Sequence, residues 1–176
     1  MAVLPILTAD HAVLRQKGKK IRTSANASLQ RLIDDMIDTM RDAYGVGLAA
    51  PQVGKSLQVA VIEIPEQEVL VLVNPEIIKR TGQRQVEEGC LSVPGYRGLV
   101  WRSETVTIKA LNRRGKEIRI NRATGLLAQA LEHEIDHLNG ILYLDHLVAH
   151  EKLWKIEPHA VVPETEAAGM PQEPGR

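Results

Sequence analysis

The feature that most constrains the fold is a run of short segments rich in Val and Ile, placed between two helical patterns. Leu57–Ile64 and Val69–Val73 are too short for confident helices and have the residue content of buried strands. Ile77 and Ile78 are expected to continue the same sheet. Because these strands follow one another instead of alternating with helices, the sequence predicts an α+β fold with antiparallel sheets.

A second stretch has the period of a β-hairpin. Apolar and polar residues alternate over Thr105–Ala110 and again over Glu117–Ile120, and the turn residues Asn112–Gly115 lie between them. One face of this hairpin is therefore expected to contact the core.

Three helices are predicted. In Asn26–Tyr44 the apolar residues recur at steps of three and four, with Asn26 as the N-cap and Gly45 as the stop. The second helix covers about Thr124–Leu138, and a short third helix is expected in His146–Ile156. We expect the second helix to be central and to pack against the antiparallel sheets, with the N-terminal helix and the short C-terminal helix beside it.

The length of 176 residues suits one globular domain, which we expect to span residues 1–156. The remaining residues, 157–176, hold four of the nine prolines and have no periodic apolar pattern. They are expected to form a flexible tail.

Composition excludes several classes of function. The 22 basic and 22 acidic residues balance to zero, so no overall positive field favours nucleic acid, and aromatic residues make up only 3% of the chain. No sequence-specific nucleic-acid partner is expected. No apolar run approaches the ~20 residues of a membrane span, the first ten residues lack a signal-peptide pattern, and one cysteine allows no internal disulfide. We expect a cytoplasmic protein with no membrane partner.

The strongest chemical signal is His133-Glu134-Ile135-Asp136-His137. Residues four apart share one face of a helix, so His133 and His137 can direct two imidazoles at one metal ion, with Glu134 beside them. A catalytic metal usually keeps three protein ligands and one open position. The lone Cys90 is the candidate for the third ligand, because a metal accounts for an unpaired thiol. The alternatives are two ordinary surface histidines and an inert buried cysteine.

A third motif is Gly45–Gln52, which contains two glycines and two alanines. These small residues let another chain approach the backbone, and Gln52 can donate an amide N–H to a carbonyl oxygen. The segment lacks the Lys-Ser/Thr ending of a phosphate loop and follows a predicted helix instead of a strand. Nucleotide binding is therefore not favoured.

Together, Gly45–Gln52, Glu88–Ser92 and His133–His137 resemble, in the same order, the three motifs of the peptide deformylases. The resemblance covers about residues 5–156, and each motif is complete. It implies a single catalytic metallohydrolase domain that removes the formyl group from N-formylmethionyl nascent polypeptides and releases formate. It also implies Fe(II) as the native divalent metal, although one thiolate and two imidazoles also suit Zn, Ni or Co.

The motifs lead to a mechanistic hypothesis. The metal lowers the pKa of a water molecule, Glu134 accepts its proton, and the resulting hydroxide attacks the formyl carbon. The resemblance implies that the Gln52 side-chain amide and the Leu91 backbone N–H stabilise the tetrahedral oxyanion. Glu134 then delivers the proton to the leaving amine.

Substrate binding is assigned to two segments. The substrate is expected to lie extended along Val46 and Gly47, adding its backbone to the edge of a sheet. On the second helix, three residues lie on the same face as His133 and are expected to form the wall of a methionine pocket: Leu126, Gln129 and Ala130. Simple core packing is the alternative for Leu126 and Ala130.

Charged residues near the motifs have a supporting role or a surface role. Glu88 and Arg102 can form an ion pair behind the cysteine, and Asp136 can brace its own helix or orient a neighbouring histidine. Surface salt bridges are the alternative for all three. Arg97 is a candidate for the mouth of the cleft, whereas nothing distinguishes His146 from an ordinary surface histidine.

Two other kinds of function remain open at this point: a general metallopeptidase with the same helix motif, and a noncatalytic domain with a structural metal. A transient ribosome contact is also expected from the nascent-chain substrate. Arg97–Arg122 contains eight Lys/Arg against Glu104 and Glu117, a charge of 8−2=+6. This hairpin could meet ribosomal RNA or could simply be solvated, and the third helix is another possible contact.

Overall fold

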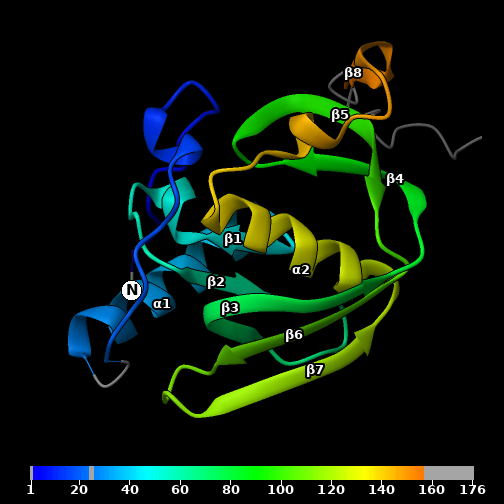
Figure 1. The fold of residues 1–176 in the computed structure, drawn as a ribbon. Coiled ribbons are helices and arrows are strands. Elements are labelled where there is room, and N and C mark those ends of the chain that lie inside the picture. Colours follow the sequence, from blue (N-terminus) through cyan, green and yellow to red (C-terminus); the bar gives the residue numbers. More distant parts are fainter. Residues whose placement is uncertain (1, 24–25, 157–176) are drawn as a thin grey trace, which may run out of the picture.

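The structure is a computed structural model that describes residues 2–23 and 26–156 (Figure 1). Its α-helices are α1 (Ala27–Asp42) and α2 (Gly125–Leu138). The strands are β1 (Gly47–Ala49), β2 (Val59–Ile62), β3 (Leu70–Thr81), β4 (Arg84–Cys90), β5 (Val93–Arg102), β6 (Thr105–Leu111), β7 (Glu117–Ala123) and β8 (Leu153–Lys155). Short 3₁₀ helices are η1 (Ala12–Arg15), η2 (Ala50–Val53), η3 (Tyr143–His146) and η4 (His150–Lys152).

The strands form two antiparallel sheets. One has the order β1-β2-β3-β6-β7 and the other has the order β4-β5-β8. Figure 1 shows α2 running across the five-stranded sheet, with β4 and β5 arching over it. The α+β class and the central second helix are confirmed.

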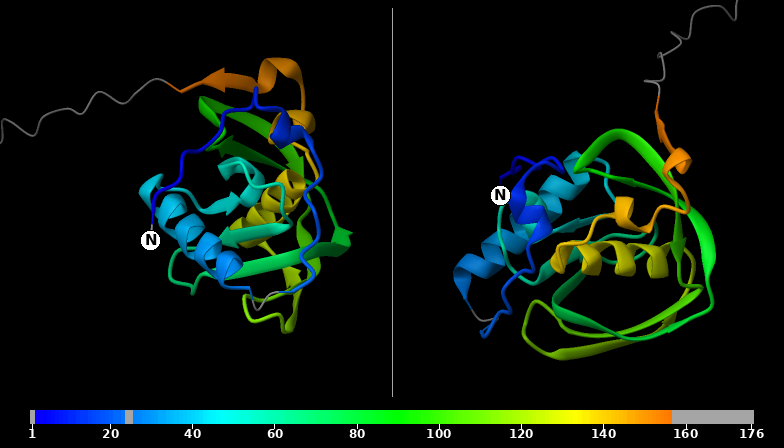
Figure 2. Two further views of the ribbon diagram at one scale, coloured as in Figure 1. Left: turned by 90° about the vertical axis from the view of Figure 1, so that its left-hand side faces the viewer. Right: turned by 45° about the horizontal axis from the view of Figure 1, so that its top comes forward.

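The two α-helices pack on opposite faces of the five-stranded sheet (Figure 2). Successive side chains of a strand point to opposite faces. In β2, Val59 and Val61 therefore join the apolar cluster with α1, whereas Ile62 joins the cluster with α2. The uninterrupted apolar run of β2 is explained by helices on both of its faces.

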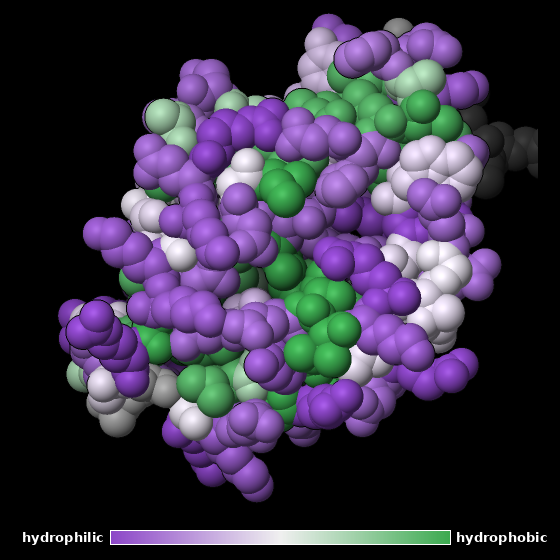
Figure 3. Space-filling model, in the orientation of Figure 1, coloured by the Kyte–Doolittle hydropathy of each residue, from purple (hydrophilic) through white to green (hydrophobic). Residues whose placement is uncertain are grey.

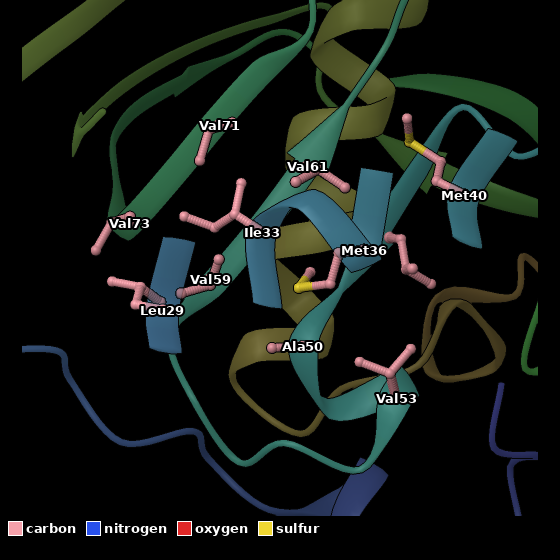
Figure 4. Packing of buried hydrophobic residues seen from close by; sticks show 11 residues of the cluster. Leu29, Ile33, Met36, Met40, Ala50, Val53, Val59, Val61, Val71 and Val73 are labelled. Carbon is pink, nitrogen blue, oxygen red and sulfur yellow. The ribbon is translucent and has the colours of Figure 1, made fainter. Parts of the chain in front are cut away.

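The first helix forms close to its predicted bounds. Its N-cap is Asn26, whose side chain accepts a hydrogen bond from the Ser28 N–H at 2.9 Å. At the other end, the Gly45 N–H donates to the Met40 carbonyl at 2.9 Å after Tyr44 turns into the left-handed region at φ 52°. Its methionines lie in the core, where Met36 packs beside Ile33 (Figure 4).

The predicted hairpin is confirmed as β6 and β7, and the predicted strand after residue 69 is confirmed as the start of β3. β3 continues past Asn74-Pro75 through an irregularity in its pairing with β6, and so reaches Ile77 and Ile78. Thr124 occupies the N-cap position of α2 as predicted, but its side chain makes no capping hydrogen bond.

The short C-terminal helix expected in His146–Ile156 is wrong. The segment holds the end of η3, then η4 and the strand β8, which pairs with β5. Both ends of this stretch are tied to β5, because the Val148 N–H donates to the Leu99 carbonyl at 2.9 Å and the Ile156 N–H donates to the Gly95 carbonyl at 2.8 Å. Without this segment the edge of β5 would have unpaired backbone N–H and C=O groups, and a strand can pair with them whereas a helix cannot. The predicted tail, residues 157–176, lies outside the described residues.

Sequence periodicity missed the hairpin of β4 and β5. Many of its side chains are polar and exposed, so apolar alternation is weak. Cys90, which the sequence placed in no strand, is the last residue of β4. The motif Gly45–Gln52 covers the strand β1 and the first three residues of the 3₁₀ helix η2. Among the described residues, no helix is long and apolar enough to span a bilayer.

Candidate metal centre

The structure brings three metal-ligand candidates together from two elements. Cys90 ends β4, and His133 and His137 lie one helical turn apart on α2. One donor atom of each residue lies within 4.8 Å of the others, and Cys90 Sγ is 3.2 Å from His137 Nε2. The predicted spacing therefore places both imidazoles and the thiol around one point.

The His133 ring is held from behind by a carboxylate. His133 Nδ1 lies 2.8 Å from Glu88 Oε2, which leaves Nε2 as its free donor atom. The Arg102 guanidinium donates two hydrogen bonds to Glu88, at 2.7 and 2.9 Å. It donates a third to Asp136 Oδ2 at 2.5 Å. All of these groups except the histidine are almost fully buried, so the surface salt bridge considered as an alternative for these residues is wrong.

Charge complementarity keeps this cluster ionised. Burial opposes ionisation of Glu88, but hydrogen bonds from His133 and Arg102 outweigh it and lower the pKa of Glu88 to about 2. Burial also works against the charge of Arg102, yet the contacts with Glu88 and Asp136 raise the pKa of Arg102 above its ordinary value. A buried carboxylate–guanidinium network of this kind fixes the position of the imidazole that it contacts.

Cys90 is positioned by Ser92, two residues further along the chain, and by Gln52 of η2. The Ser92 backbone N–H points at Cys90 Sγ from 3.4 Å, and Gln52 Nε2 lies 3.6 Å from the same sulfur. Gln52 Nε2 also donates to Ser92 Oγ at 3.2 Å, and Gln52 Oε1 accepts the Ala49 N–H at 2.8 Å. The buried amide of Gln52 thereby connects β1 to the cysteine.

Glu134 has the environment of a proton carrier. Its side chain is buried, and Oε2 has no hydrogen-bond partner among the described residues. Burial raises the pKa of Glu134 to about 7; the charges of His133 and Arg102 oppose this rise, and those of Glu88 and Asp136 add to it. A pKa near the working pH suits a group that must both accept and release a proton. A Cβ atom at Gly47 would come too close to Glu134 Oε1, so any larger residue there would force the Glu134 side chain to move.

The donor set fits a divalent transition metal. Burial lowers the pKa of His137 well below 6.5, which keeps its imidazole neutral and able to bind. Burial also disfavours the charged form of His133, but hydrogen bonds to Cys90 and Glu88 outweigh this and raise its pKa. The thiol and Glu88 thus favour a positive charge at this point, and a metal ion that replaces the proton would supply it.

One cleft of about 470 Å³ connects the predicted residues. Its lining contains every residue assigned to catalysis or substrate binding, together with two of the three metal-ligand candidates, Cys90 and His133. Those assigned residues are Val46, Gly47, Gln52, Leu91, Leu126, Gln129, Ala130 and Glu134. Arg97 also lines the cleft, in agreement with its predicted position.

The walls of the cleft differ in character. β1, which contains Gly47, is an edge strand of the five-stranded sheet and has a backbone edge available for pairing. Leu126 is 44% exposed, whereas Ala130 is buried and also belongs to the core cluster under α2. The Gln129 amide donates to the Glu87 carbonyl at 2.9 Å, which ties α2 to β4 at the rim.

Sequence reasoning missed three supporting residues. Buried Glu132 accepts hydrogen bonds from Arg80 at 2.9 Å and from the Ser103 N–H at 2.8 Å. Tyr143 stacks on His133 with ring centroids 6.2 Å apart. His146, predicted to be an ordinary surface histidine, lies 3.0 Å from Asp136. No periodic pattern marks these residues, because their partners come from distant parts of the chain.

Comparisons with known proteins agree with this geometry. Residues 3–153 match the model of the family described as polypeptide deformylase. A peptide deformylase of Dehalococcoides mccartyi is 55% identical over 165 residues, which cover 93% of this chain and 98% of that protein. The crystal structure of a peptide deformylase from Legionella pneumophila has a TM-score of 0.81 and 51% identity, covering 86% of this chain and 89% of that one. A Synechococcus elongatus peptide deformylase in complex with actinonin has a TM-score of 0.81 and 39% identity, covering 86% and 82%.

Proposed function

Because the chain belongs to the polypeptide deformylase family, we propose a specific role for each of the main residues of its cleft. The activity is the metal-dependent hydrolysis of the N-formyl group from N-formylmethionyl nascent polypeptides, with release of formate. The observation that carries the proposal is that Cys90, His133 and buried Glu134 line one cleft, with a donor atom of His137 within 4.8 Å of those of Cys90 and His133. The catalytic unit is proposed to span residues 1–156.

Cys90, His133 and His137 are proposed to hold the metal. When bound, a divalent ion supplies Lewis-acid chemistry, polarising the formyl group and making a water molecule more acidic. Glu88 supports this role because it fixes the His133 ring through Nδ1 and leaves Nε2 for the metal. The Ser92 N–H stabilises the negative charge of the Cys90 sulfur.

Glu134 is proposed to transfer the protons of the reaction. Its carboxylate takes a proton from the attacking water and returns it to the amine that leaves when the C–N bond breaks. Burial raises its pKa to about 7, so both the loss and the gain of a proton are accessible near neutral pH. Glu134 is adjacent to a ligand in sequence but is not needed as a ligand itself.

Gln52 and Leu91 are proposed to stabilise the oxyanion. Gln52 Nε2 lies in the cleft wall beside the cysteine, and its side chain is 1% exposed and fixed by the Ala49 N–H. The backbone N–H of Leu91 follows the cysteine directly. Donors fixed before the reaction lose little free energy to reorganisation, and removal of one such donor typically costs about 3–4 kcal/mol of transition-state stabilisation.

The substrate is proposed to lie along the edge strand β1. Backbone hydrogen bonds to Val46 and Gly47 would tolerate varied sequence after the first residue. Leu126, Gln129 and Ala130 on α2 form the opposite wall, where a methionine side chain could bind. Selectivity for the first residue would then reside in contacts with α2, and affinity for the peptide in contacts with β1.

Fe(II) is proposed as the native metal, with Zn, Ni and Co as substitutes that the same ligands accept. An iron–thiolate site should lose activity in air through oxidation of the metal or of Cys90, whereas the zinc form should resist. Anaerobically purified protein, loaded with each metal in turn, tests this by its formate-release rate before and after exposure to air. Equal persistence of the iron and zinc forms would contradict the proposal.

Cytoplasmic location and a transient ribosome contact are proposed from the nascent-chain substrate. The structure narrows the basic surface considered for that contact. Arg102 is buried and paired, and Lys109 and Arg113 have acidic partners, so those charges are largely neutralised. Arg114 and Lys116 at the tip of the β6–β7 hairpin are exposed. Cosedimentation with ribosomes at low salt should weaken when Arg114 and Lys116 are neutralised, and an unchanged result would remove the hairpin from consideration.

The decisive test combines formate release from a formyl-Met peptide with metal analysis of the same preparation. Loss of both in Cys90→Ala, and loss of turnover with metal retained in Glu134→Gln, is the expected pattern. Cleavage of internal peptide bonds without formate release would favour a general metallopeptidase. A metal that persists after replacement of Cys90 would remove this cysteine from the proposed ligand set.

A further inference from the structure

The charged network behind His133 extends one residue beyond Asp136. His146, the last residue of η3, places its ring Nε2 3.0 Å from Asp136 Oδ2. Nε2 itself is buried and makes no well-aligned hydrogen bond with any residue that the structure describes, while about a third of the side chain is exposed. The contacts therefore form a continuous series from a partly exposed histidine to a metal-ligand candidate.

The buried charges next to His146 leave Asp136 in need of a second hydrogen-bond donor. Two buried carboxylates, Glu88 and Asp136, share the single positive charge of Arg102. Arg102 donates from Nε and Nη2 to Glu88 and from Nη1 to Asp136. The position of Asp136 therefore affects the orientation of the guanidinium and its hydrogen bonds to Glu88. A buried carboxylate with one donor is poorly compensated, and a second donor stabilises it. His146 is placed to be that second donor.

The backbone that carries His146 is fixed at several points. Asp145 Oδ2 accepts the Leu142 N–H at 2.9 Å and a hydrogen bond from Arg15 at 2.5 Å. Tyr143, in the same 3₁₀ helix, is 1% exposed and stacks on His133. His146 thus belongs to a braced turn and not to a mobile surface.

We infer that His146 is a positioning residue for the metal centre: its Nε2 holds Asp136 and, through Arg102 and Glu88, the orientation of the His133 ring. This inference rests on the proposed ligand role of His133. Loss of the Nε2 donor should let Asp136 and Arg102 shift, so that Glu88 holds Nδ1 of His133 less firmly. The expected consequence is faster release of the metal, because partners behind a ligand govern metal affinity.

The experiment uses the zinc-loaded full-length protein and three replacements of one residue. His146→Gln keeps an amide N–H near the position of Nε2, His146→Asn reaches only as far as Nδ1, and His146→Leu removes both donors. His150→Leu, in the exposed next turn η4, is the matched control. The readouts are the rate of zinc transfer to a chelator, the thermal midpoint of the metal-free protein, and turnover.

We expect zinc release about tenfold faster in the Leu and Asn variants, with the Gln variant and the His150 control near the wild-type rate. A purely structural role would lower the thermal midpoint of the metal-free protein in the Asn and Gln variants alike and would not separate their release rates. Unchanged release in the Asn variant, or equal acceleration in Asn and Gln, would overturn the inference. If the Leu variant does not fold, the Asn and Gln pair still decides. Zinc content that survives His133→Ala would instead show that the proposed ligand role has failed.

Discussion

The two α-helices cover opposite faces of one sheet but bury different chemistry. α1 buries an apolar stripe that includes Ile33 and Met36 (Figure 4). α2 buries apolar residues on its sheet-facing side, and in addition Glu132, Glu134 and Asp136. Each of these carboxylates has charged or polar partners from other elements except Glu134, whose Oε2 has none among the described residues.

The difference suggests that α1 contributes mainly to the stability of the fold, whereas α2 also carries the side chains of the candidate site. Buried apolar side chains contribute in proportion to the area that they remove from water, and their exact partners matter less. Buried charges stabilise only when their partners are in place, so α2 is tied to particular residues of β4 and β5. The face shown in Figure 3 is mostly hydrophilic, with apolar side chains visible at the top of the view, over the region of β5 and β8, and again near its middle.

The largest expected effect tests whether the unpartnered carboxylate of α2 serves the reaction. Glu134→Gln keeps the volume but removes the proton acceptor, so turnover should fall by about 10²–10⁴-fold. The free energy of unfolding should not fall, because Gln carries no charge to bury. Formate release and urea unfolding of the metal-loaded protein measure the two effects. Near-normal turnover with metal retained would rule out the proton-transfer role of Glu134.

The next effect tests whether the partnered charges of α2 depend on one another. Arg102→Met leaves Glu88 and Asp136 buried without their shared cation, which should cost roughly 3–5 kcal/mol of unfolding free energy. Metal content should fall as well, because Glu88 would no longer be held against His133. Urea denaturation and metal analysis provide the measurements. A loss below about 1 kcal/mol would mean that the buried charges of α2 are compensated elsewhere.

A comparable loss of stability without loss of function is expected from α1. Ile33→Ala removes a fully buried side chain and should cost roughly 2–5 kcal/mol of unfolding free energy. Ile33 does not line the cleft, so kcat/KM per folded molecule should stay near the wild-type value. Unfolding curves and formate release under native conditions test both statements. A large fall in kcat/KM would show that α1 also shapes the reaction site.

The smallest expected effect comes from the ion pair of Asp34 on α1 with Arg113, which is the exposed counterpart of the buried pair of Asp136 on α2 with Arg102. Arg113 donates to Asp34 at 2.8 Å, but both side chains are about 40% exposed. Arg113→Met should therefore cost no more than about 1 kcal/mol, and less at high salt. Urea unfolding at two ionic strengths gives the measurement, with Arg102→Met as the buried counterpart. Equal costs for the two arginines would contradict the role assigned to burial.

Local spacing was sufficient to predict a good part of the site. The histidine spacing on α2 predicted two imidazoles on one face, and the structure has them beside one thiol. The apolar stripe and the N-cap of α1 were predicted for the same reason: both depend on helix geometry over a few residues. The hairpin of β6 and β7 also has its turn and alternation within one short stretch.

Contacts between distant segments were decided only by the tertiary structure. The sequence suggested an ion pair of Glu88 with Arg102, but burial of that pair depends on how β4, β5 and α2 close around it. The sequence predicted an ordinary surface histidine at position 146, but η3 brings this residue to 3.0 Å from Asp136 of α2. The segment predicted to be the last helix contains the strand β8 instead, because the edge of β5 is available for pairing. A short sequence pattern fixes periodicity along the chain, whereas the solvation and pairing of a charge depend on which distant surfaces exclude water from it.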